Sequence, residues 1–308
     1  MLSIEATEKL NTDKFNFPVD LLNIKTDTIS GTNNTYKELR IPRNIGRAVI
    51  RKDTDEAIAI VGKDYHLVPH QDLFEEVTHQ LEMSDKSFEN INVKDSIFNK
   101  GAIVKRSIVC LDDKYKVTIP TKGIKEDYQH LRLDVYNSYD MSMGFHFVIG
   151  GYGHYCSNLQ VFQGKAFVQH YGKHTVNLNA VNMVKDISKL VDSYMHEAER
   201  MSHWGEITIK DGTVFDFLKN TICKTSNYNA NNVNRKRYEL LTTLYKKETE
   251  MWGSTLWSLY NTLTHWGTHE TGSPSRTPKY QINRQVELRN KVFNTNYWKD
   301  LVALNNIG

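Results

Sequence analysis

The chain has 308 residues, of which 39% are hydrophobic and 24% charged, a balance typical of a globular protein with a substantial core. Its net charge of +3 excludes a global basic field, so any nucleic-acid-binding surface must be local. The sequence has neither a charged-then-apolar beginning nor an apolar run long enough to span a bilayer, which predicts a cytoplasmic protein without a membrane partner.

The first 40 residues are polar and rich in Thr and Asn, and their weak periodicity predicts a mostly extended, partly mobile arm. Residues 41–176 form a predicted β-rich core, because apolar and polar residues alternate there in short segments bounded by turn residues. The predicted strands are 47–51, 57–61, 102–111, 115–119, 131–137 and 144–150. One helix interrupts them at 68–83, where Leu73, Val77 and Leu81 recur every fourth residue.

From 177 to 308 the periodicity becomes helical. An apolar stripe within 178–203 recurs at spacings of three and four and consists of Val184, Ile187, Val191, Tyr194, Ala198 and Met201. Such a stripe packs on the chain's own sheet, which we favour, or forms a seam between subunits, which would make a homo-oligomer. Further helices are predicted at 235–250, 251–266 and 285–294, with a loop at 267–280. We therefore predict an α+β fold, a β-rich half with one embedded helix followed by a helical half, in one continuous domain.

The stretch HYCSNLQVFQG (154–164) places His154 and Cys156 two residues apart, on the same face of a strand. The pair has three interpretations: half of a metal site, a nucleophile beside its base, or part of an ordinary core. A reactive thiolate needs a neighbouring cation or helix terminus, and the adjacent sequence offers neither. Because free cysteines are often buried, the core interpretation of Cys156 is favoured. Cys110 and Cys223 lie far away in sequence, which argues against a disulfide framework.

The sequence motifs of common enzyme sites are missing. The chain has no phosphate-binding loop with a Gly-Lys-Ser/Thr ending, no complete dinucleotide loop, no paired-histidine zinc protease motif and no nucleophile elbow. The pairs His170/His174 and His265/His269 have a spacing that suits zinc, but each straddles a glycine near the end of a strand or helix. The sequence thus predicts no catalytic residue, no cofactor and no metal site.

Cations and aromatic residues alternate along the predicted strands. A groove for single-stranded nucleic acid needs cations along the phosphates and rings on which bases stack. The expected phosphate contacts are Arg47, Arg51, Lys105, Arg106, Lys116 and Arg132. The expected stacking residues are Tyr136, Phe147 and Tyr152. The alternative, a half-buried sheet with rings inside and lysines outside, stays open on composition alone.

Four blocks of the sequence carry a family resemblance: VGKDYHLVPHQDLFE (61–75), YNSYDMSMGFHFVIGGYGHYCSNLQVF (136–162), QHYGKHT (169–175) and GSTLWSLYNTLTHWGTHE (253–270). In this order they resemble the phage and plasmid proteins of the domain-of-unknown-function 932 family. The positions that match the family pattern are Asn137, Ser138, Asp140, Cys156, Asn158, Leu159, His174, Thr175, Trp257, Asn261 and His269. The chain departs from the pattern at Tyr139, at Met141-Ser142, and at Gly153-His154, where the family has an arginine.

The resemblance implies a mobile-element context without an established chemistry. Because His154 stands where relatives carry a cation, a polar contact to a ligand fits it better than metal binding. Asn137, Asn158 and His174 are expected to be polar contacts or organisers of turns, and the turn role suits asparagine best.

Together these observations predict a phage- or plasmid-encoded single-stranded DNA-binding protein in the host cytoplasm. Strand annealing in replication or recombination, and association with other proteins of those processes, are further expectations. One alternative is a protein that blocks a host-defence factor. The other is a metal-dependent nuclease, which would require the side chains Asp134, Asp140, His154, His170 and His174 to converge.

Overall fold

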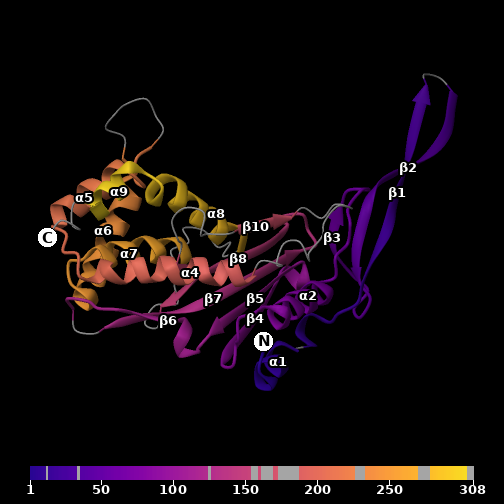
Figure 1. The fold of residues 1–308 in the computed structure, drawn as a ribbon. Coiled ribbons are helices and arrows are strands. Elements are labelled where there is room, and N and C mark those ends of the chain that lie inside the picture. Colours follow the sequence, from indigo (N-terminus) through magenta and orange to yellow (C-terminus); the bar gives the residue numbers. More distant parts are fainter. Residues whose placement is uncertain are drawn as a thin grey trace.

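The computed structural model describes residues 1–11, 13–32, 35–123, 126–153, 159–160, 169–172, 187–225, 233–269 and 278–303; residues 13, 25–32, 35–45, 159–160 and 169–172 are described through their backbone alone. Strands and most helices occupy different parts of the molecule, and a long β-hairpin extends away from the body (Figure 1). This arrangement confirms the predicted α+β class, with strands dominating the first half of the chain and helices the second.

The described strands are β1 (Val19–Thr32), β2 (Thr35–Arg51), β3 (Glu56–Val61), β4 (Ile91–Phe98), β5 (Ile103–Cys110), β6 (Lys116–Ile119), β7 (Asp127–Ser138), β8 (Phe145–Gly153), β9 (Leu159–Gln160) and β10 (Gln169–Gly172). The described helices are α1 (Ile4–Leu10), α2 (His70–Met83), α4 (Ile187–Ser202), α5 (Asp211–Asn220), α6 (Arg235–Trp252), α7 (Leu256–Thr268), α8 (Pro278–Leu288) and α9 (Asn296–Ala303), with the π-helix η6 (Arg289–Phe293) before α9. Short 3-10 turns are η1 (Asp13–Phe15), η2 (Asn99–Gly101), η3 (Asp113–Tyr115) and η5 (His203–Gly205).

Seven of the described strands form an antiparallel sheet. β10, β8, β7, β5 and β4 follow one another across it, β6 continues beside β7, and β9 lies beside β8. Since successive residues of a strand point to opposite faces, every strand contributes to two different surfaces. Side chains such as Val104, Ile108 and Leu133 are buried on the face that α1, α2 and α4 cover, which we call the helix-covered face.

The apolar stripe of α4 packs inside its own chain. Val191, Tyr194, Ala198 and Met201 are all buried, and α4 lies against β6, β7 and β8. The described residues of the stripe are therefore used by the core and are not available as a seam between subunits. The part of the predicted helix before Ile187 lies outside the described residues.

Helices α6 and α7 form a hairpin around which the helical half packs. The sequence predicted one helix over 251–266, but Gly253 has φ of +75°, which ends α6, and the Thr255 hydroxyl accepts from Ser258 N to cap α7. α7 is buried nearly all round, including Trp257, Tyr260 and Trp266, as expected for a central helix. None of the described helices is long and apolar enough to cross a membrane.

The prediction of an extended arm over residues 1–40 is wrong at its beginning. Ser3 caps α1, and Ala6 and Leu10 of this helix are buried in the main core. One helix of seven residues buries too few side chains to show a clear period in the sequence, which explains the difference.

The rest of the predicted arm belongs to the long hairpin. β1 and β2 pair from Val19/Arg51 to Thr32/Thr35, and β3 pairs with the end of β2. A small second core that includes Phe17, Val49 and Tyr65 packs at its base. The charged residues of the two strands are Lys25, Lys37, Arg40, Arg43, Arg47 and Arg51 against Asp20, Asp27 and Glu38, a net charge of +3 that equals that of the whole chain.

Asp127 ties the beginning of β7 to α7. Its Oδ2 accepts a hydrogen bond from Trp257 Nε1 at 3.1 Å, and its Oδ1 accepts from Tyr128 N at 2.9 Å. Burial raises the pKa of this carboxyl to about 6, an effect that the two hydrogen bonds offset only in part. The folded state therefore favours the protonated acid, and its stability falls as pH rises through that value.

Replacing Asp127 by Asn should make the stability difference between variant and wild type depend on pH. The wild type loses stability between about pH 4 and 6, because its carboxyl has a pKa of about 3.9 when unfolded and about 6 when folded. The variant should gain about 1–3 kcal/mol relative to the wild type over this interval. Urea unfolding at pH 4 and pH 8 measures the change, and an equal difference at both pH values would contradict the raised pKa.

Candidate nucleic-acid interface

The sheet face opposite the helix-covered face carries cations and rings on neighbouring strands. Lys116 of β6 pairs with His130 of β7, and His130 pairs with Tyr152 of β8, so these three side chains lie on one face. We call this surface the cationic face; its residues are Lys94, Lys105, Lys116, Tyr128, His130, Arg132 and Tyr152. Lys94 and Lys116 are exposed, while the rings of Tyr128 and Tyr152 are half-buried.

A charge triad of Lys105, Asp134 and Arg132 lies at the centre of the cationic face. Lys105 Nζ is 2.9 Å from Asp134 Oδ2, and Arg132 Nε is 2.8 Å from Asp134 Oδ1. The Tyr136 hydroxyl also donates to Asp134 Oδ2 at 3.3 Å. Asp134 is fully buried, and the two cations are nearly so. Two cations thus share one carboxylate, which leaves one uncompensated positive charge.

The triad is held in its ionised form. Burial alone would raise the pKa of Asp134, but Arg132 and Lys105 outweigh it and hold the pKa well below its usual range. Burial lowers the pKa of Lys105, and Asp134 offsets part of that effect. Burial also acts against the charge of Arg132, but Asp134 raises its pKa above the ordinary value. The ion pairs therefore stabilise the fold above the unfolded pKa of Asp134, about 3.9, and this contribution is lost as pH falls below it.

A cavity of about 470 Å³ opens beside the triad. It is bounded on the sheet by Asn92, Val93, Lys94, Lys105, Ser107, Val109, Leu111, Arg132 and Tyr152, and on the helical side by Thr268, His269, Gln281 and Gln285. The guanidinium of Arg132 lies 5.6 Å from the ring centroid of Tyr152. Lys94, Lys105 and Arg132 outnumber the single carboxylate of Asp134, so the cavity suits an anion and places a ring beside it.

A second cation–ring pair extends the cationic face along β6 and β7. Lys116 Nζ lies 4.4 Å from the ring centroid of Tyr128, and the Tyr128 ring contacts His130 edge-on at 5.7 Å. Because His130 pairs with Tyr152, these rings connect the exposed Lys116 to the cavity. The face therefore offers a continuous path of cations and rings, the combination that a single strand requires.

Arg106, one of the predicted phosphate contacts, is on the wrong face of the sheet. Its side chain is buried on the helix-covered face, where it forms two hydrogen bonds of 2.9 Å with Asp95 and donates to Leu10 O at 2.8 Å. Consecutive residues of a strand cannot line the same groove, so Lys105 and Arg106 have different roles. Arg106 anchors α1 to the sheet.

The predicted stacking residues also differ, in this case in whether their rings are exposed. Tyr136 and Phe147 have no exposed surface, so neither ring is accessible to a base. Tyr136 lies on the cationic face beneath Lys105, whose Nζ is 5.0 Å from its ring centroid. Tyr152 alone of the three remains accessible and lines the cavity.

Arg47 and Arg51 belong to the other sheet, at the base of the long hairpin. Arg51 pairs with Asp53, lies 4.1 Å from the ring centroid of Phe17 and donates to Lys100 O. Arg47 Nη1 lies 3.5 Å from Tyr65 O. These contacts make both arginines part of the hairpin base, separate from the cationic face.

Asn137 organises structure, which is the role that suited it best from the sequence. Its Nδ2 donates to Val68 O at 3.2 Å and lies 2.9 Å from His70 Nδ1. His70 Nε2 lies 2.9 Å from Gly101 O, and its ring stacks on Tyr139 at 3.8 Å. The predicted contacts His154, Asn158 and His174 lie outside the described residues.

The carboxylates of the nuclease alternative have structural partners. Asp134 forms the charge triad, and Asp140 accepts from Ser142 N at 2.9 Å in the turn after β7. Within the described ranges no three His, Cys, Asp or Glu side chains are placed to hold a metal ion. The rings of His265 and His269 contact each other at 5.1 Å, and His269 lines the cavity.

Lys94 and Tyr128 are functional candidates that sequence reasoning missed. Lys94 lies in β4, an edge strand in which four of the eight residues are polar, and Tyr128 lies before the start of the strand predicted at 131–137. The apolar residues Ile91, Val93 and Ile97, each an even number of positions apart, could have indicated β4, but only the pairing with β5 places Lys94 opposite Ser107.

Residues 57–293 match the sequence model of the family described as Domain of unknown function (DUF932), and the chain belongs to this family. No curated protein and no solved structure matches the chain significantly. The matched range contains every strand of the seven-stranded sheet and leaves out the long hairpin. The cationic face therefore lies wholly within the family's part of the chain.

Replacing Asp134 by Asn should destabilise the fold by about 3–5 kcal/mol, because two buried cations lose their shared counter-charge. Asp53→Asn is the matched control, since it removes a carboxylate paired with Arg51 at the surface and should cost at most about 1 kcal/mol. Urea unfolding at pH 7 compares them. Equal small losses in both variants would show that the triad contributes no more than a surface pair.

Asn137→Ala should lower the free energy of unfolding by about 1–3 kcal/mol, because Val68 O and His70 Nδ1 lose a buried partner. Asn90→Ala, at an exposed position, should change it by less than about 0.5 kcal/mol. Thermal unfolding monitored by circular dichroism gives both values. An Asn137→Ala protein as stable as the Asn90→Ala protein would rule out the organising role.

Proposed function

We propose that this protein binds single-stranded DNA across the cationic face. The observation that carries the proposal is the cavity at which Lys94, Lys105 and Arg132 meet the ring of Tyr152. Phosphates would lie against the cations, and an unpaired base would stack on the ring, since base–aromatic stacking contributes about 1–3 kcal/mol. Duplex DNA keeps its bases stacked on each other, so half-buried rings favour a single strand.

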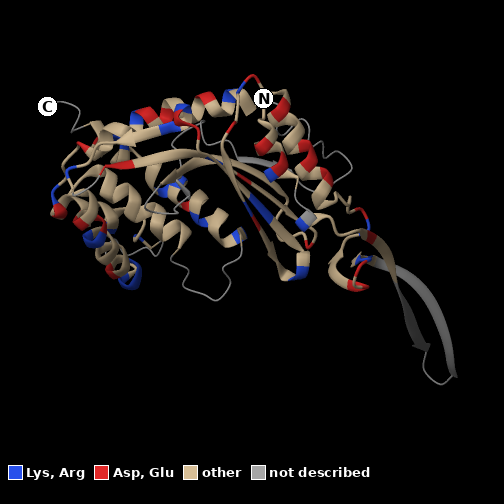
Figure 2. Cartoon of the chain, turned by 90° about the horizontal axis from the view of Figure 1, so that it is seen from below, with Lys and Arg blue, Asp and Glu red and all other residues tan. Residues whose placement is uncertain are grey.

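The charge distribution over the two faces of the sheet supports this orientation. Helices α1, α2 and α4, which cover the other face, carry nine acidic and three basic residues. Figure 2 shows acidic residues on the helices near the N-terminus. A polyanion approaching the molecule is repelled from that side and attracted to the cationic face.

The long hairpin supplies a second basic element. Its net charge of +3 is carried on two paired strands that extend beyond the body (Figure 1). β-Ribbons of this kind enter grooves or follow the backbone of nucleic acids in other proteins. We propose that the hairpin contacts the phosphates of the same strand next to the cationic face, which would favour strand annealing in replication or recombination of a phage or plasmid.

A second candidate function rests on α2, which has four acidic residues and no Lys or Arg. Such a surface suits a basic protein partner, including a host-defence factor. Binding of a protein partner through α2 would be unaffected by changes on the cationic face.

A fluorescence-anisotropy titration with labelled oligo-dT tests the proposal, with duplex DNA and oligo-U titrated in parallel. Binding should favour the single strand and weaken with salt on a log–log slope of about −1.4 to −2.8, as expected for two to four neutralised phosphates. Lys94→Gln/Lys116→Gln should make the slope shallower by about 1.4. Tyr152→Leu should lower affinity about fivefold or more at every salt concentration.

Lys246→Gln/Lys247→Gln is the matched control, because both lysines are exposed on α6, away from the cavity. It removes the same charge and should leave the affinity almost unchanged. Absence of binding at low salt, or equal losses in the two double variants, would overturn the proposal.

A further inference from the structure

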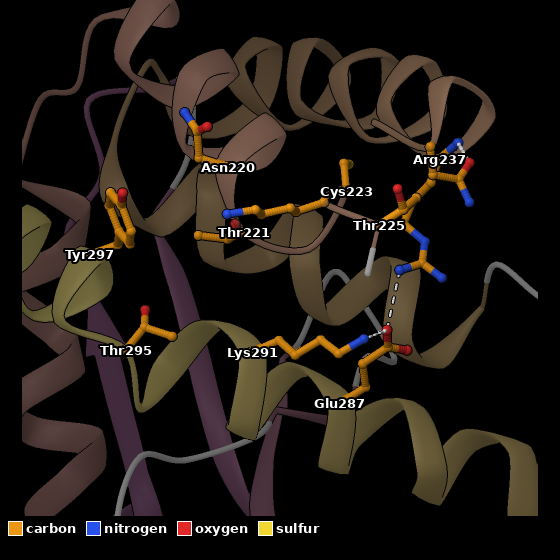
Figure 3. Close-up of a pocket in the computed structure, with 11 residues that line it drawn as sticks. Asn220, Thr221, Cys223, Thr225, Arg237, Glu287, Lys291, Thr295 and Tyr297 are labelled. Atoms are coloured by element: carbon orange, nitrogen blue, oxygen red, sulfur yellow. Dashed lines mark hydrogen bonds and ion pairs between the residues drawn. The ribbon is translucent and has the colours of Figure 1, made fainter. Parts of the chain in front are cut away.

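A second polar pocket lies in the helical half, apart from the sheet. It has a volume of about 580 Å³ and is formed by the end of α5, the beginning of α6, the end of α8 with η6, and the beginning of α9 (Figure 3). Its lining includes Lys224, Arg237, Glu287, Lys291 and Tyr297. This volume lies within the range of small-molecule sites, about 300–1,000 Å³.

Positive charge dominates this pocket. Glu287 accepts hydrogen bonds from Lys291 Nζ at 3.0 Å and from Arg237 Nη1 at 3.2 Å, and Lys224 adds a third cation. Burial alone would raise the pKa of Glu287, but Lys291 and Arg237 outweigh it and lower the pKa below the usual value. Glu287 is therefore ionised and holds two cations at the wall, while the pocket keeps an excess of two positive charges.

Several of the neutral lining groups are committed to the backbone. The Thr221 hydroxyl donates to Phe217 O, the Thr295 hydroxyl donates to Val292 O, and Asn234 Oδ1 accepts from Arg237 N at the start of α6. A ligand would therefore be recognised mainly by the cations. Lys224 and Lys291 are exposed enough to move towards it, whereas Arg237 is also fixed by a hydrogen bond of 2.8 Å to Ile222 O.

An exposed ring stands across the pocket from Arg237. Tyr297 is 62% exposed, an unusual value for an aromatic residue, and Figure 3 shows it with Asn220 on the side opposite Arg237 and Glu287. The same ring borders a neighbouring hollow with Phe217 and Asp300. A planar group could stack on Tyr297 while an attached anion reaches the cations.

We propose that this pocket binds a phosphomonoester of nucleotide size. The phosphate lies among Lys224, Lys291 and Arg237, and the base stacks on Tyr297. Such a group could be a free mononucleotide or the 5′-phosphate end of a strand, which share the recognised chemistry. Burial raises the pKa of Cys223 to about 12, so its thiol is neutral at pH 7 and the pocket binds its ligand without a thiolate nucleophile.

Isothermal titration calorimetry with AMP, adenosine and inorganic phosphate tests the pocket. AMP should bind at least tenfold more tightly than adenosine, which lacks the anion, and more tightly than inorganic phosphate, which lacks the ring. Lys224→Gln/Lys291→Gln should weaken AMP binding at least tenfold, and Tyr297→Ala at least threefold. Lys299→Gln, an exposed lysine of α9 outside the pocket, should bind AMP as the wild type does.

Absence of AMP binding to the wild type, or an equal affinity in the pocket variant and in Lys299→Gln, would overturn the proposal. Circular dichroism melting of each variant confirms that the fold is retained, since both lysines are exposed. If Lys224→Gln/Lys291→Gln unfolds, the test rests on Tyr297→Ala alone. An AMP affinity of Tyr297→Ala equal to that of the wild type would then overturn the proposal.

Comparing the affinities for oligo-dT with and without a 5′-phosphate distinguishes a strand end from a free mononucleotide as the ligand. A preference for the phosphorylated strand that disappears in Lys224→Gln/Lys291→Gln assigns the pocket to a strand end, and equal affinities with retained AMP binding assign it to a free nucleotide. This proposal does not depend on the proposed function. Lys94→Gln/Lys116→Gln should leave the affinity for AMP unchanged even where it weakens the binding of oligo-dT.

Discussion

The shared carboxylate of Asp134 is the constraint on which the cationic face depends. A buried carboxylate is tolerated only when cations and hydrogen bonds replace its hydration, and here Lys105, Arg132 and Tyr136 do so. Replacing the whole triad by apolar residues would change net stability little, whereas removing Asp134 alone is costly because it leaves two buried cations without a counter-charge. The consequence of the triad is electrostatic: two cations are fixed in position at a cavity, with one charge in excess.

The alternation of the strands lets one sheet carry two opposite surfaces. In β5, Lys105 joins the triad on one face, and Arg106 pairs with Asp95 on the other and anchors α1. A shift of the register by one residue would exchange these two cations and bury an uncompensated charge against α2. The antiparallel pairing of β5 with β4 and β7 therefore determines on which face of the sheet each charged residue lies, as it does for the apolar residues.

Much of the fold could be predicted from the sequence, because it follows from local periodicity. The strands from 102 to 150 alternate clearly, and the helix at 68–83 carries a regular apolar stripe. The helix α1 was missed because a helix of seven residues buries few side chains, and the hairpin was missed because its polar, Thr- and Asn-rich strands lack clear alternation. The break between α6 and α7 was predicted after residue 250, but its position at Gly253 depends on a positive φ, for which the apolar pattern has no signal.

The candidate site was less accessible to sequence reasoning. Because successive side chains of a strand point to opposite faces, the sequence could have placed Lys105 and Arg106 on different faces of the sheet. It could not show which of the two faces the helices cover. Tyr136 and Tyr152 look equivalent in the sequence, and only packing distinguishes a ring buried beneath Lys105 from one that lines the cavity. Lys94 and His269 meet at that cavity from segments about 175 residues apart, a distance that no local pattern bridges.

The most direct test of the central claim is to locate the strand on the molecule. Oligo-dT carrying 5-iododeoxyuridine would be photo-crosslinked to the protein, and the modified peptides would be identified by mass spectrometry. The account predicts crosslinks at Tyr128 or Tyr152, the accessible rings of the cationic face. Crosslinks confined to α1, α2 or α4 would contradict it, because they would place the strand on the acidic, helix-covered side.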